Sequence, residues 1–213
     1  MKVSVIIRCR NEEEHIGLAI QSVIDHFKNP EIIIIDNQST DESMKVVSLF
    51  DRYDITKYSL NGNYTPGKAL NFGVKKASNN IILVLSAHAQ ITTINIEMLS
   101  QWFMDGYVAI FGNQTPIYKG KKITKRYIWS HFVNTTKENL YSKIEDRQFL
   151  HNAFCFYNRQ FLLNNPMPEQ YAGKEDRYWA ADIVNKGYNY YYNSTHKINH
   201  FYTTNGATWK GMG

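Results

Sequence analysis

Hydrophobic positions in the first half of the chain alternate between short continuous runs and stretches with helical spacing. Residues 3–7 form an apolar run rich in β-branched side chains, and residues 32–35 and 81–85 form similar runs. Between the runs, apolar residues recur three or four positions apart, first from Ile16 and again from Met44. Strands that are buried on both faces have continuous runs of this kind. The pattern therefore predicts a mostly parallel sheet wrapped by helices, which is an α/β fold.

The breaks between these runs give the expected elements. In the first half we expect strands at residues 3–7, 32–35, 55–60 and 81–85, and helices at 11–27 and 39–50 and after Gly67. Asn11 is expected to cap the first helix, with Glu12, Glu13 and Glu14 in its first turn. After residues 107–111 the alternation stops, and we expect a helix at 127–141, a strand at 149–157, a helix at 175–186 ended by Gly187, and a strand at 188–192.

Length and composition favour one domain. A chain of 213 residues with 43% hydrophobic residues can bury one sizeable core, and it has no internal repeat or linker-like segment. We therefore treat residues 1–213 as a single domain. The two cysteines, Cys9 and Cys155, lie in apolar surroundings, which argues against a disulfide framework or a cysteine zinc site.

The net charge of +5 favours partners with negative charge, such as a nucleoside diphosphate, a lipid-linked phosphate, an anionic membrane surface or a nucleic acid. Residues 119–126 contain a basic run that either lies against anionic lipid or forms a solvated loop. No apolar stretch has the length of a membrane span, and no cleavable leader follows Met1. We therefore expect a cytoplasmic protein, with association to the inner face of the membrane as an open alternative.

Polar residues follow three of the predicted strands directly. Arg8, Arg10 and Asn11 follow the first strand, Asp36 and Asn37 the second, and Ser86 and His88 the fourth. In an open parallel sheet, ligands bind beyond the carboxyl ends of the strands. The sequence thus predicts one pocket at this edge. There Asp36 either accepts hydrogen bonds from a base or ribose or forms a turn with Ser39.

Residues 62–68 have the spacing of a phosphate-binding loop before a helix. The next residue is Ala69, which lacks the hydroxyl that a nucleotide triphosphatase uses to hold magnesium. A triphosphatase is therefore the third choice of function. Lys68 remains a candidate for meeting a phosphate or a base, with a solvated lysine as the alternative.

The order of several motifs resembles family 2 glycosyltransferases of the GT-A fold. The segments at 4–13, 35–41 and 67–73 carry the resemblance. Ser86-Ala87-His88-Ala89 is similar to a bacterial, rhamnosyltransferase-like subset, and the segment at 173–179 resembles the late acidic motif of the family. The resemblance implies a nucleotide-sugar-binding half at 1–112 and an acceptor-binding half at 113–213.

The resemblance also implies roles for individual residues. Asp36 would contact the nucleobase, and the rest of the nucleotide-sugar site would be Arg8, Arg10, Asn11, Asn37, Asp41, Lys68, Ser86 and His88. Asp176, with Glu175 as its neighbour, would act as the base that removes a proton from the acceptor hydroxyl. From the residues alone, the same two carboxylates are ordinary in the first turn of a helix. His151 and Asn152 would line the acceptor pocket, or would simply pack in a strand.

The metal motif of the family is altered here. Family members usually carry Asp-x-Asp after the fourth strand, whereas this chain has Ser86 and His88. Mn²⁺ and Mg²⁺ prefer oxygen ligands. A divalent cation therefore stays an open expectation, with His88 and His200 as its candidate ligands. The alternative is that His88 donates a hydrogen bond or positive charge to the leaving phosphate.

Together these features predict an inverting glycosyltransferase. The expected donor is a nucleoside-diphosphate sugar and the expected acceptor a saccharide or lipid-linked molecule in bacterial surface polysaccharide synthesis, with no nucleic-acid partner. The alternative is a non-catalytic nucleotide-sugar or carbohydrate-binding module of the same fold. Aromatic residues such as Trp179, Trp209 and Tyr188 to Tyr192 either stack on sugar rings or pack in the core, and we expect core packing for most.

Overall fold

The computed structural model of the chain describes residues 2–60, 62–122, 127–204, 206 and 209. The first half alternates strands and helices as the hydrophobic pattern predicts: β1 (Val3–Cys9), α1 (Ile16–His26), β2 (Glu31–Asp36), α2 (Ser43–Ser48), β3 (Ile55–Ser59), α3 (Pro66–Lys76) and β4 (Ile81–Ser86). β5 (Ala89–Thr93) and α4 (Ile96–Met104) follow. The second half adds β6 (Ala109–Tyr118), β11 (Phe154–Asn158), α5 (Arg159–Asn164), α6 (Glu175–Asn185) and β12 (Tyr190–Phe201).

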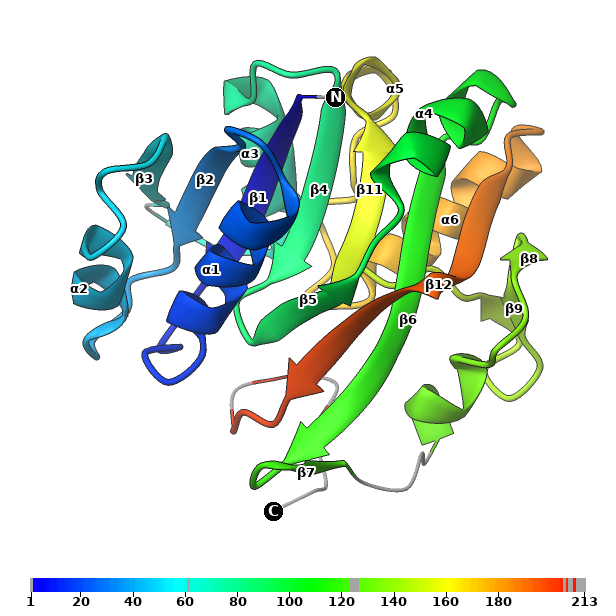
Figure 1. Ribbon diagram of the computed structural model, residues 1–213. Helices are drawn as coiled ribbons and strands as arrows, with labels where there is room; N and C mark the ends of the chain where they lie inside the picture. Colours follow the sequence, from blue (N-terminus) through cyan, green and yellow to red (C-terminus); the bar gives the residue numbers. More distant parts are fainter. Residues whose placement is uncertain (1, 61, 123–126, 205, 207–208, 210–213) are drawn as a thin grey trace.

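One sheet contains the strands of both halves, in the order β3-β2-β1-β4-β11-β6-β12-β5 (Figure 1). β1 pairs in parallel with β2 and β4, and β2 pairs in parallel with β3. β11 is antiparallel to β4 and β6, whereas β12 is parallel to β6. The register places Arg8 opposite Ser86 and Ile35, and Cys9 opposite Asp36. The polar residues that follow these strands are thus brought to one edge.

Helices cover both faces of the sheet (Figure 1). Leu70 and Val74 of α3 lie with Trp179 and Ile183 of α6 in the core on one face. The core on the other face contains apolar residues of α1 and Leu99 of α4. The prediction of a mostly parallel sheet between helices is confirmed. So is the prediction of core packing for Trp179, Tyr190 and Tyr192, which are buried.

The predicted start of the first helix is wrong. α1 begins at Ile16, so Asn11 does not cap it, and the three glutamates precede its first turn. Asn11 has a positive φ of 54°, which turns the chain away from helical geometry. The carbonyl of Glu12 then accepts hydrogen bonds from the N–H groups of His15 and Ile16. Glu12 is therefore in a turn at the end of β1, where its side chain can face the edge of the sheet.

The predicted helix at 127–141 is also wrong. Residues Tyr127–His131 form one 3₁₀ turn, and the short strands β8 (Lys137–Glu138) and β9 (Tyr141–Ser142) follow. β8 pairs with β12, and β9 pairs with β10 (Arg147–Gln148), so sheet pairing overrides the weak helical spacing. β11 starts five residues later than predicted, at Phe154, and β12 extends to Phe201 rather than ending at Tyr192.

The elements α4, α5 and β5 were also not predicted. α4 and α5 each begin after an asparagine whose side chain accepts a helix N–H, Asn95 from Met98 and Asn158 from Phe161. β5 was missed because its buried residues are few, at Ala89 and Ile91.

The basic run falls partly on β7 (Lys121–Lys122), where both lysines are exposed. Residues 123–126 lie outside the described residues. Within the described ranges, every helix is too short or too polar to cross a bilayer.

Candidate functional site

Ser39 connects the loops that follow β1 and β2. Its N–H donates to both carboxylate oxygens of Asp36 at 3.2 Å, and its hydroxyl accepts from the N–H of Asn11 at 3.0 Å. The amide oxygen of Asn11 accepts from the N–H of Thr40 at 2.8 Å. The N–H of Asn37 donates to the carbonyl of Cys9 at 2.8 Å. The turn between Asp36 and Ser39 is therefore present, and it holds the Asp36 carboxylate at the carboxyl end of β2.

Asp41 fixes the same two loops from the outer side. Its carboxylate accepts from the N–H of Glu13 at 3.1 Å and from the N–H and hydroxyl of Ser43 at 3.0 and 2.5 Å. Burial alone raises the pKa of Asp41, but these hydrogen bonds outweigh burial and lower it. Asp41 is thus held as a carboxylate that links the end of β1 to the start of α2.

The carboxylate network consists of Arg8, Asn152, Glu175 and Asp176. Arg8 Nη1 lies 3.2 Å from Glu175 Oε1, which also accepts from Asn152 Nδ2 at 3.2 Å. Asp176 accepts from the backbone N–H groups of Asn152 and Arg177, both at 2.9 Å. Residues that are far apart in the sequence are thereby joined at the carboxyl end of β1.

Burial and nearby charges shift the pKa of Asp176. The residue is only 7% exposed. Burial, with the nearby negative charge of Glu175, raises the pKa of Asp176 to about 7, although the hydrogen bonds from Asn152 and Arg177 and the charge of Arg8 oppose the rise. A carboxyl group with a pKa near neutrality can accept a proton from a substrate and release it again.

The histidine network consists of Glu12, Ser86, His88, Gln114, His151 and His200. His88 Nδ1 lies 2.8 Å from Glu12 Oε1, and His88 Nε2 lies 3.1 Å from the hydroxyl of Ser86. Because a carboxylate oxygen accepts, His88 Nδ1–H is the donor of this hydrogen bond to Glu12. The His88 ring stacks on the ring of His200, with 4.8 Å between their centroids.

Gln114 of β6 bridges the other two histidines. Its amide oxygen accepts from His200 Nδ1 at 2.7 Å, and its amide nitrogen donates to His151 Nδ1 at 2.9 Å. Burial lowers the pKa of His151 to about 3 and lowers the pKa of His200 well below its usual value. His151 and His200 are therefore neutral rings, and His200 presents a bare Nε2.

The two networks meet at the junction of β1, β4 and β11. Arg8 lies opposite Ser86 across the β1–β4 pair, and the N–H of Ser86 donates to the carbonyl of Ala153 at 3.0 Å. Asn152 and His151, which belong to different networks, are consecutive residues just before β11. The structure thus brings most of the predicted site residues to one edge of the sheet.

Arg10 and Lys68 belong to neither network. Both are exposed, and Lys68 Nζ contacts the carbonyl of Asn63 at 3.3 Å. The start of α3 packs tightly at Gly67, where a Cβ atom would come within 2.2 Å of the carbonyl oxygen of Pro168. The backbone of residues 168 and 169 therefore lies against the helix end that a phosphate-binding loop would use.

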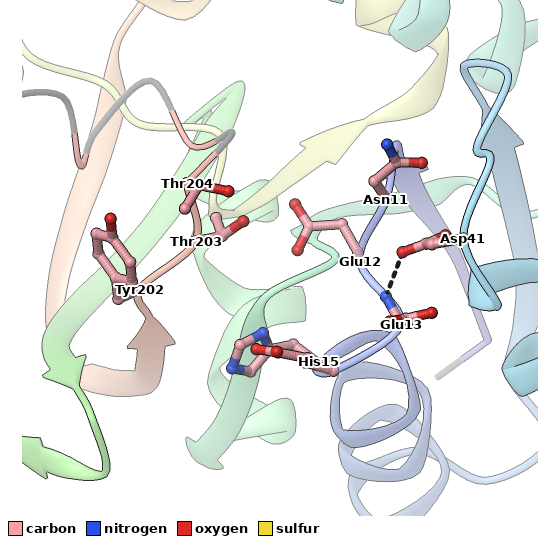
Figure 2. Close-up of a pocket in the computed structure, with 9 residues that line it drawn as sticks. Asn11, Glu12, Glu13, His15, Asp41, Tyr202, Thr203 and Thr204 are labelled. Carbon is pink, nitrogen blue, oxygen red and sulfur yellow. Dashed lines mark hydrogen bonds between the residues drawn. The ribbon is translucent and has the colours of Figure 1, made fainter. Parts of the chain in front are cut away.

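An open depression lies beside the histidine network, between the end of β1 and the segment after β12 (Figure 2). It encloses about 300 Å³ and is lined by Asn11, Glu12, Glu13, Glu14, His15, Asp41, Tyr202, Thr203 and Thr204. Figure 2 shows the Glu12 side chain directed across the depression toward Thr203, away from the Asp41 contact with Glu13. Glu12 therefore borders both the depression and His88.

Comparison with known proteins identifies the family. Residues 4–166 match the model of Glycosyl transferase family 2. The chain belongs to this family. It is 28% identical over 185 residues to a GalNAc(5)-diNAcBac-PP-undecaprenol beta-1,3-glucosyltransferase of Campylobacter jejuni, a match that covers 84% of this chain and 59% of that protein. It is 31% identical over 87 residues to a poly-beta-1,6-N-acetyl-D-glucosamine synthase of Staphylococcus epidermidis, covering 40% of this chain and 21% of that protein.

Solved structures share the fold. S. aureus TarS 1–349 in complex with UDP-GlcNAc matches with a TM-score of 0.74 at 19% identity, over 99% of this chain and 61% of that one. GalNAc-T7 with UDP, GalNAc and Mn²⁺ matches with a TM-score of 0.72 at 16% identity, over 97% of this chain and 45% of that one. The family 2 chain thus has the GT-A fold, and it spans about three fifths of the Campylobacter jejuni relative and of TarS 1–349.

The side chains that could bind a metal ion at the end of β4 differ from those of an oxygen-rich cation site. The described residues contain no cluster of three or more His, Cys, Asp or Glu side chains suited to a metal ion. His88 has Glu12 on one ring nitrogen and Ser86 on the other, and His200 gives only its Nε2. Mg²⁺ and Mn²⁺ prefer several oxygen ligands, and this set offers one carboxylate, so the residues do not fit such an ion well.

Two residues of the histidine network, Glu12 and Gln114, and the loop residue Ser39 were not predicted as site residues. Glu12 was assigned to a helix, although its position directly after Asn11 at the end of a strand was a usable signal. Gln114 is a buried polar residue in the middle of β6, and Ser39 was considered only as a turn partner of Asp36. The sequence offers no signal that Gln114 joins two distant histidines, because that contact depends on the pairing of β6 with β12.

Proposed function

We propose that this family 2 glycosyltransferase transfers a sugar from a nucleoside-diphosphate donor to a saccharide or lipid-linked acceptor, with inversion at the anomeric carbon. The observation that carries the proposal is the position of Asp176, a buried carboxylate beside Arg8 at the carboxyl end of β1. That edge is where an open parallel sheet binds its ligands.

Asp176 is the base in this proposal. An acceptor hydroxyl attacks the anomeric carbon as its proton passes to the Asp176 carboxylate, and the bond from the sugar to the diphosphate breaks. Asp176 accepts two backbone hydrogen bonds that fix its orientation. Glu175 is paired with Arg8, which keeps its charge balanced and leaves Asp176 as the carboxylate with a pKa near 7.

The donor half is proposed at residues 1–112 and the acceptor half at 113–213. Asp36 would receive the base or ribose, and the end of β4 would receive the diphosphate. The GalNAc-T7 structure contains Mn²⁺, but the described residues at the end of β4 do not fit such an ion well, so the proposal includes no step that depends on a cation.

The names of the relatives support an acceptor at a membrane. The relative from Campylobacter jejuni acts on an undecaprenol-linked saccharide, and the other makes a polysaccharide. We propose the same class of acceptor here, in surface polysaccharide synthesis, with the chain at the inner face of the membrane. The exposed lysines of β7 would favour an anionic lipid surface.

Donor screening tests the proposal. UDP-, dTDP-, GDP- and CMP-sugars are added with and without Mn²⁺, and the melting temperature and the release of nucleotide are measured. At least one donor is expected to raise the melting temperature, because a ligand that binds the native state stabilises it. That donor should also be consumed when acceptor is present. Binding without turnover of any donor would support a binding module instead, and no binding at all would reject both functions.

A further inference from the structure

A polar groove lies on the face of β6 and β12 opposite to the histidine network. It encloses about 620 Å³ and is lined by Thr92, Asn113, Thr115, Pro116, Lys122, Asn134, Lys197 and Asn199. Successive side chains of a strand point to opposite faces. Asn113 and Thr115 therefore face away from Gln114, which bonds to His200 in the histidine network. The groove is thus separate from the sheet edge at which the sugar transfer is proposed.

Strand register places two lysines along this groove. Lys197 of β12 lies opposite Asn113 of β6. Lys122 of β7 lies opposite Ile117, four residues further along β6 (Figure 1). Residues opposite each other in paired strands share a face, so both lysines are on the face of Asn113. At about 3.3 Å per residue, the two positions are about 13 Å apart along the strand, which is longer than one sugar ring.

A bulge in β12 sets the position of Lys197. Asn193 and Lys197 lie opposite consecutive residues of β6, so residues 194–196 form the bulge. The side-chain oxygen of Asn193 accepts from the N–H and the hydroxyl of Thr195, both at 2.8 Å. Bulges re-aim the side chains that follow them. The fold itself therefore holds Lys197 beside Asn113.

Asn113 is buried at this groove without a hydrogen-bond partner for its side chain. It is 5% exposed, and its side-chain amide bonds to none of the described residues. Every other asparagine or glutamine that is buried in the described part of the chain has a side-chain hydrogen bond: Asn71 to Met167, Gln114 to His200, Asn152 to Tyr157 and Asn193 to Thr195. A buried amide without a partner costs free energy. Because Asn113 lines the groove, a polar ligand there would supply the missing bonds.

The groups around Asn113 define the chemistry of this ligand. Amides and hydroxyls such as that of Thr115 both donate and accept, which suits the hydroxyls of a saccharide. Lys122 and Lys197 are exposed and pair with no carboxylate among the described residues. The residues that line the groove include no acid, so its charge favours an anion such as phosphate. They also include no aromatic ring on which a nucleobase could stack.

We propose that this groove binds a phosphate-bearing saccharide, with Lys122 and Lys197 at the phosphate and the Asn113 amide at sugar hydroxyls. The inference rests on the proposed function in one respect, since the ligand would be part of the saccharide or lipid-linked acceptor. Bound on the opposite face from the histidine network, this part would anchor the acceptor while another part reacts at Asp176.

The test uses glucose 6-phosphate as the probe, with glucose and inorganic phosphate as its two separate halves. Each is titrated into the ¹⁵N-labelled chain in excess UDP, or in the nucleoside diphosphate that the donor screen identifies, so that the donor edge is occupied. Nuclear magnetic resonance follows the side-chain amide of Asn113 and the backbone amides of Thr115 and Lys197. The variants are Asn113→Leu, Lys122→Gln and Lys197→Gln. Lys121→Gln is the matched control, because Lys121 is the exposed neighbour of Lys122 on β7 and does not line the groove.

Glucose 6-phosphate is expected to shift these resonances and to bind about fivefold or more tightly than either half. Asn113→Leu should weaken its binding by about tenfold, as expected for loss of a hydrogen bond from a buried group. Lys122→Gln and Lys197→Gln should each weaken it by about threefold or more, and Lys121→Gln by less than about twofold. Asn113→Leu should not lower the midpoint of urea denaturation, because it removes a buried polar group that has no partner in the fold.

Four results would overturn the inference. Glucose 6-phosphate could leave the three amides unshifted at its highest usable concentration, or Lys121→Gln could weaken binding as much as Lys122→Gln. Asn113→Leu could lower the urea midpoint, which would give Asn113 a structural role. The fourth is binding to phosphatidylglycerol vesicles in place of the probe, reduced equally by Lys121→Gln and Lys122→Gln, which would make these lysines a membrane-facing surface.

The donor screen separates this inference from the proposed function. Donor turnover without probe binding at the groove would overturn the inference alone. Probe binding at the groove without turnover of any donor would reject the proposed transfer and still support a saccharide site at Asn113.

Discussion

The carboxylate network and the histidine network lie side by side, yet the protein builds them in opposite ways. The carboxylates of Glu175 and Asp176 are on the first turn of a helix and accept hydrogen bonds from a loop and from Arg8. The histidines His151 and His200 are bonded side chain to side chain through Gln114, which is inside β6. One network therefore gathers two carboxyl groups around one arginine, whereas the other keeps the rings of His151 and His200 neutral.

The difference shows how one edge of a sheet can hold two kinds of polar network. A base needs a pKa near the working pH, and burial beside a second carboxylate supplies that for Asp176. His151 and His200 instead share the amide of Gln114 and have lowered pKa values, so this network orients buried polar groups without adding charge. His88 stands between the two, because it stacks on a neutral ring and bonds to a carboxylate.

The largest effect is expected from Asp176→Asn, which removes the proposed base from the carboxylate network. Transfer should fall by about 10² to 10⁴, the usual contribution of a positioned base, while donor affinity stays within a few-fold of the parent. Steady-state transfer rates and calorimetric affinities measure the two effects. Asp182→Asn is the control on the same helix, since Asp182 is exposed and pairs with Lys186. Equal transfer rates for Asp176→Asn and the control would remove Asp176 from the mechanism.

The histidine network is tested by Gln114→Leu. The substitution leaves the Nδ1–H of His200 without its acceptor and removes a donor from His151, both buried. We expect the free energy of unfolding to fall by about 3 kcal/mol, from one or two unsatisfied polar groups. Urea denaturation measures the change. Gln90→Leu is the control, because Gln90 makes a half-buried bond to Asn199 and should cost less than about 1 kcal/mol. Equal losses of unfolding free energy in the two variants would mean that the Gln114 bridge stabilises the fold no more than the bond between Gln90 and Asn199.

The residues at this edge also differ in how far the sequence reveals them. Arg8, Asp36, Ser86 and His88 directly follow or end apolar runs, so the rule that ligands bind at the carboxyl ends of parallel strands located them. Asp176 was located by resemblance to the family rather than by pattern. The alternation of apolar runs and helical spacing likewise predicted the sheet of the first half.

The contacts that join His88 to the other histidines were harder to predict because they depend on the second half of the sheet. His200 reaches His88 only because β12 continues to Phe201, well past the predicted end at residue 192. Gln114 meets both histidines through strand pairings that no local pattern encodes. Glu12 was assigned to a helix turn, and the positive φ of Asn11 that places it at the sheet edge is not visible from composition.

The smallest effect is a difference in pH dependence of stability between the two networks. The pKa of Asp176 is about 7 in the folded chain and near 3.8 when unfolded, so the folded state binds the extra proton between these values. The stability from Asp176 is therefore complete below about pH 4 and is lost as the pH rises through 7. His151, with a folded pKa of about 3 against 6.5, has the opposite sign: its stability is present above pH 6.5 and is lost as the pH falls toward 3.

These opposite slopes partly cancel in the parent chain, and Asp176→Asn removes one of them. The difference in unfolding free energy, Asp176→Asn minus parent, should be larger at pH 7.5 than at pH 4.5 by more than about 1 kcal/mol. The reason is that the variant has no carboxyl group at position 176 to ionise. Urea denaturation at these two pH values measures the gain, and Asp182→Asn should show almost none. A constant difference between parent and Asp176→Asn across this range would mean that Asp176 titrates as an ordinary carboxyl. The raised pKa would then no longer explain why Asp176 could act as a base near neutral pH, whatever the transfer rates show.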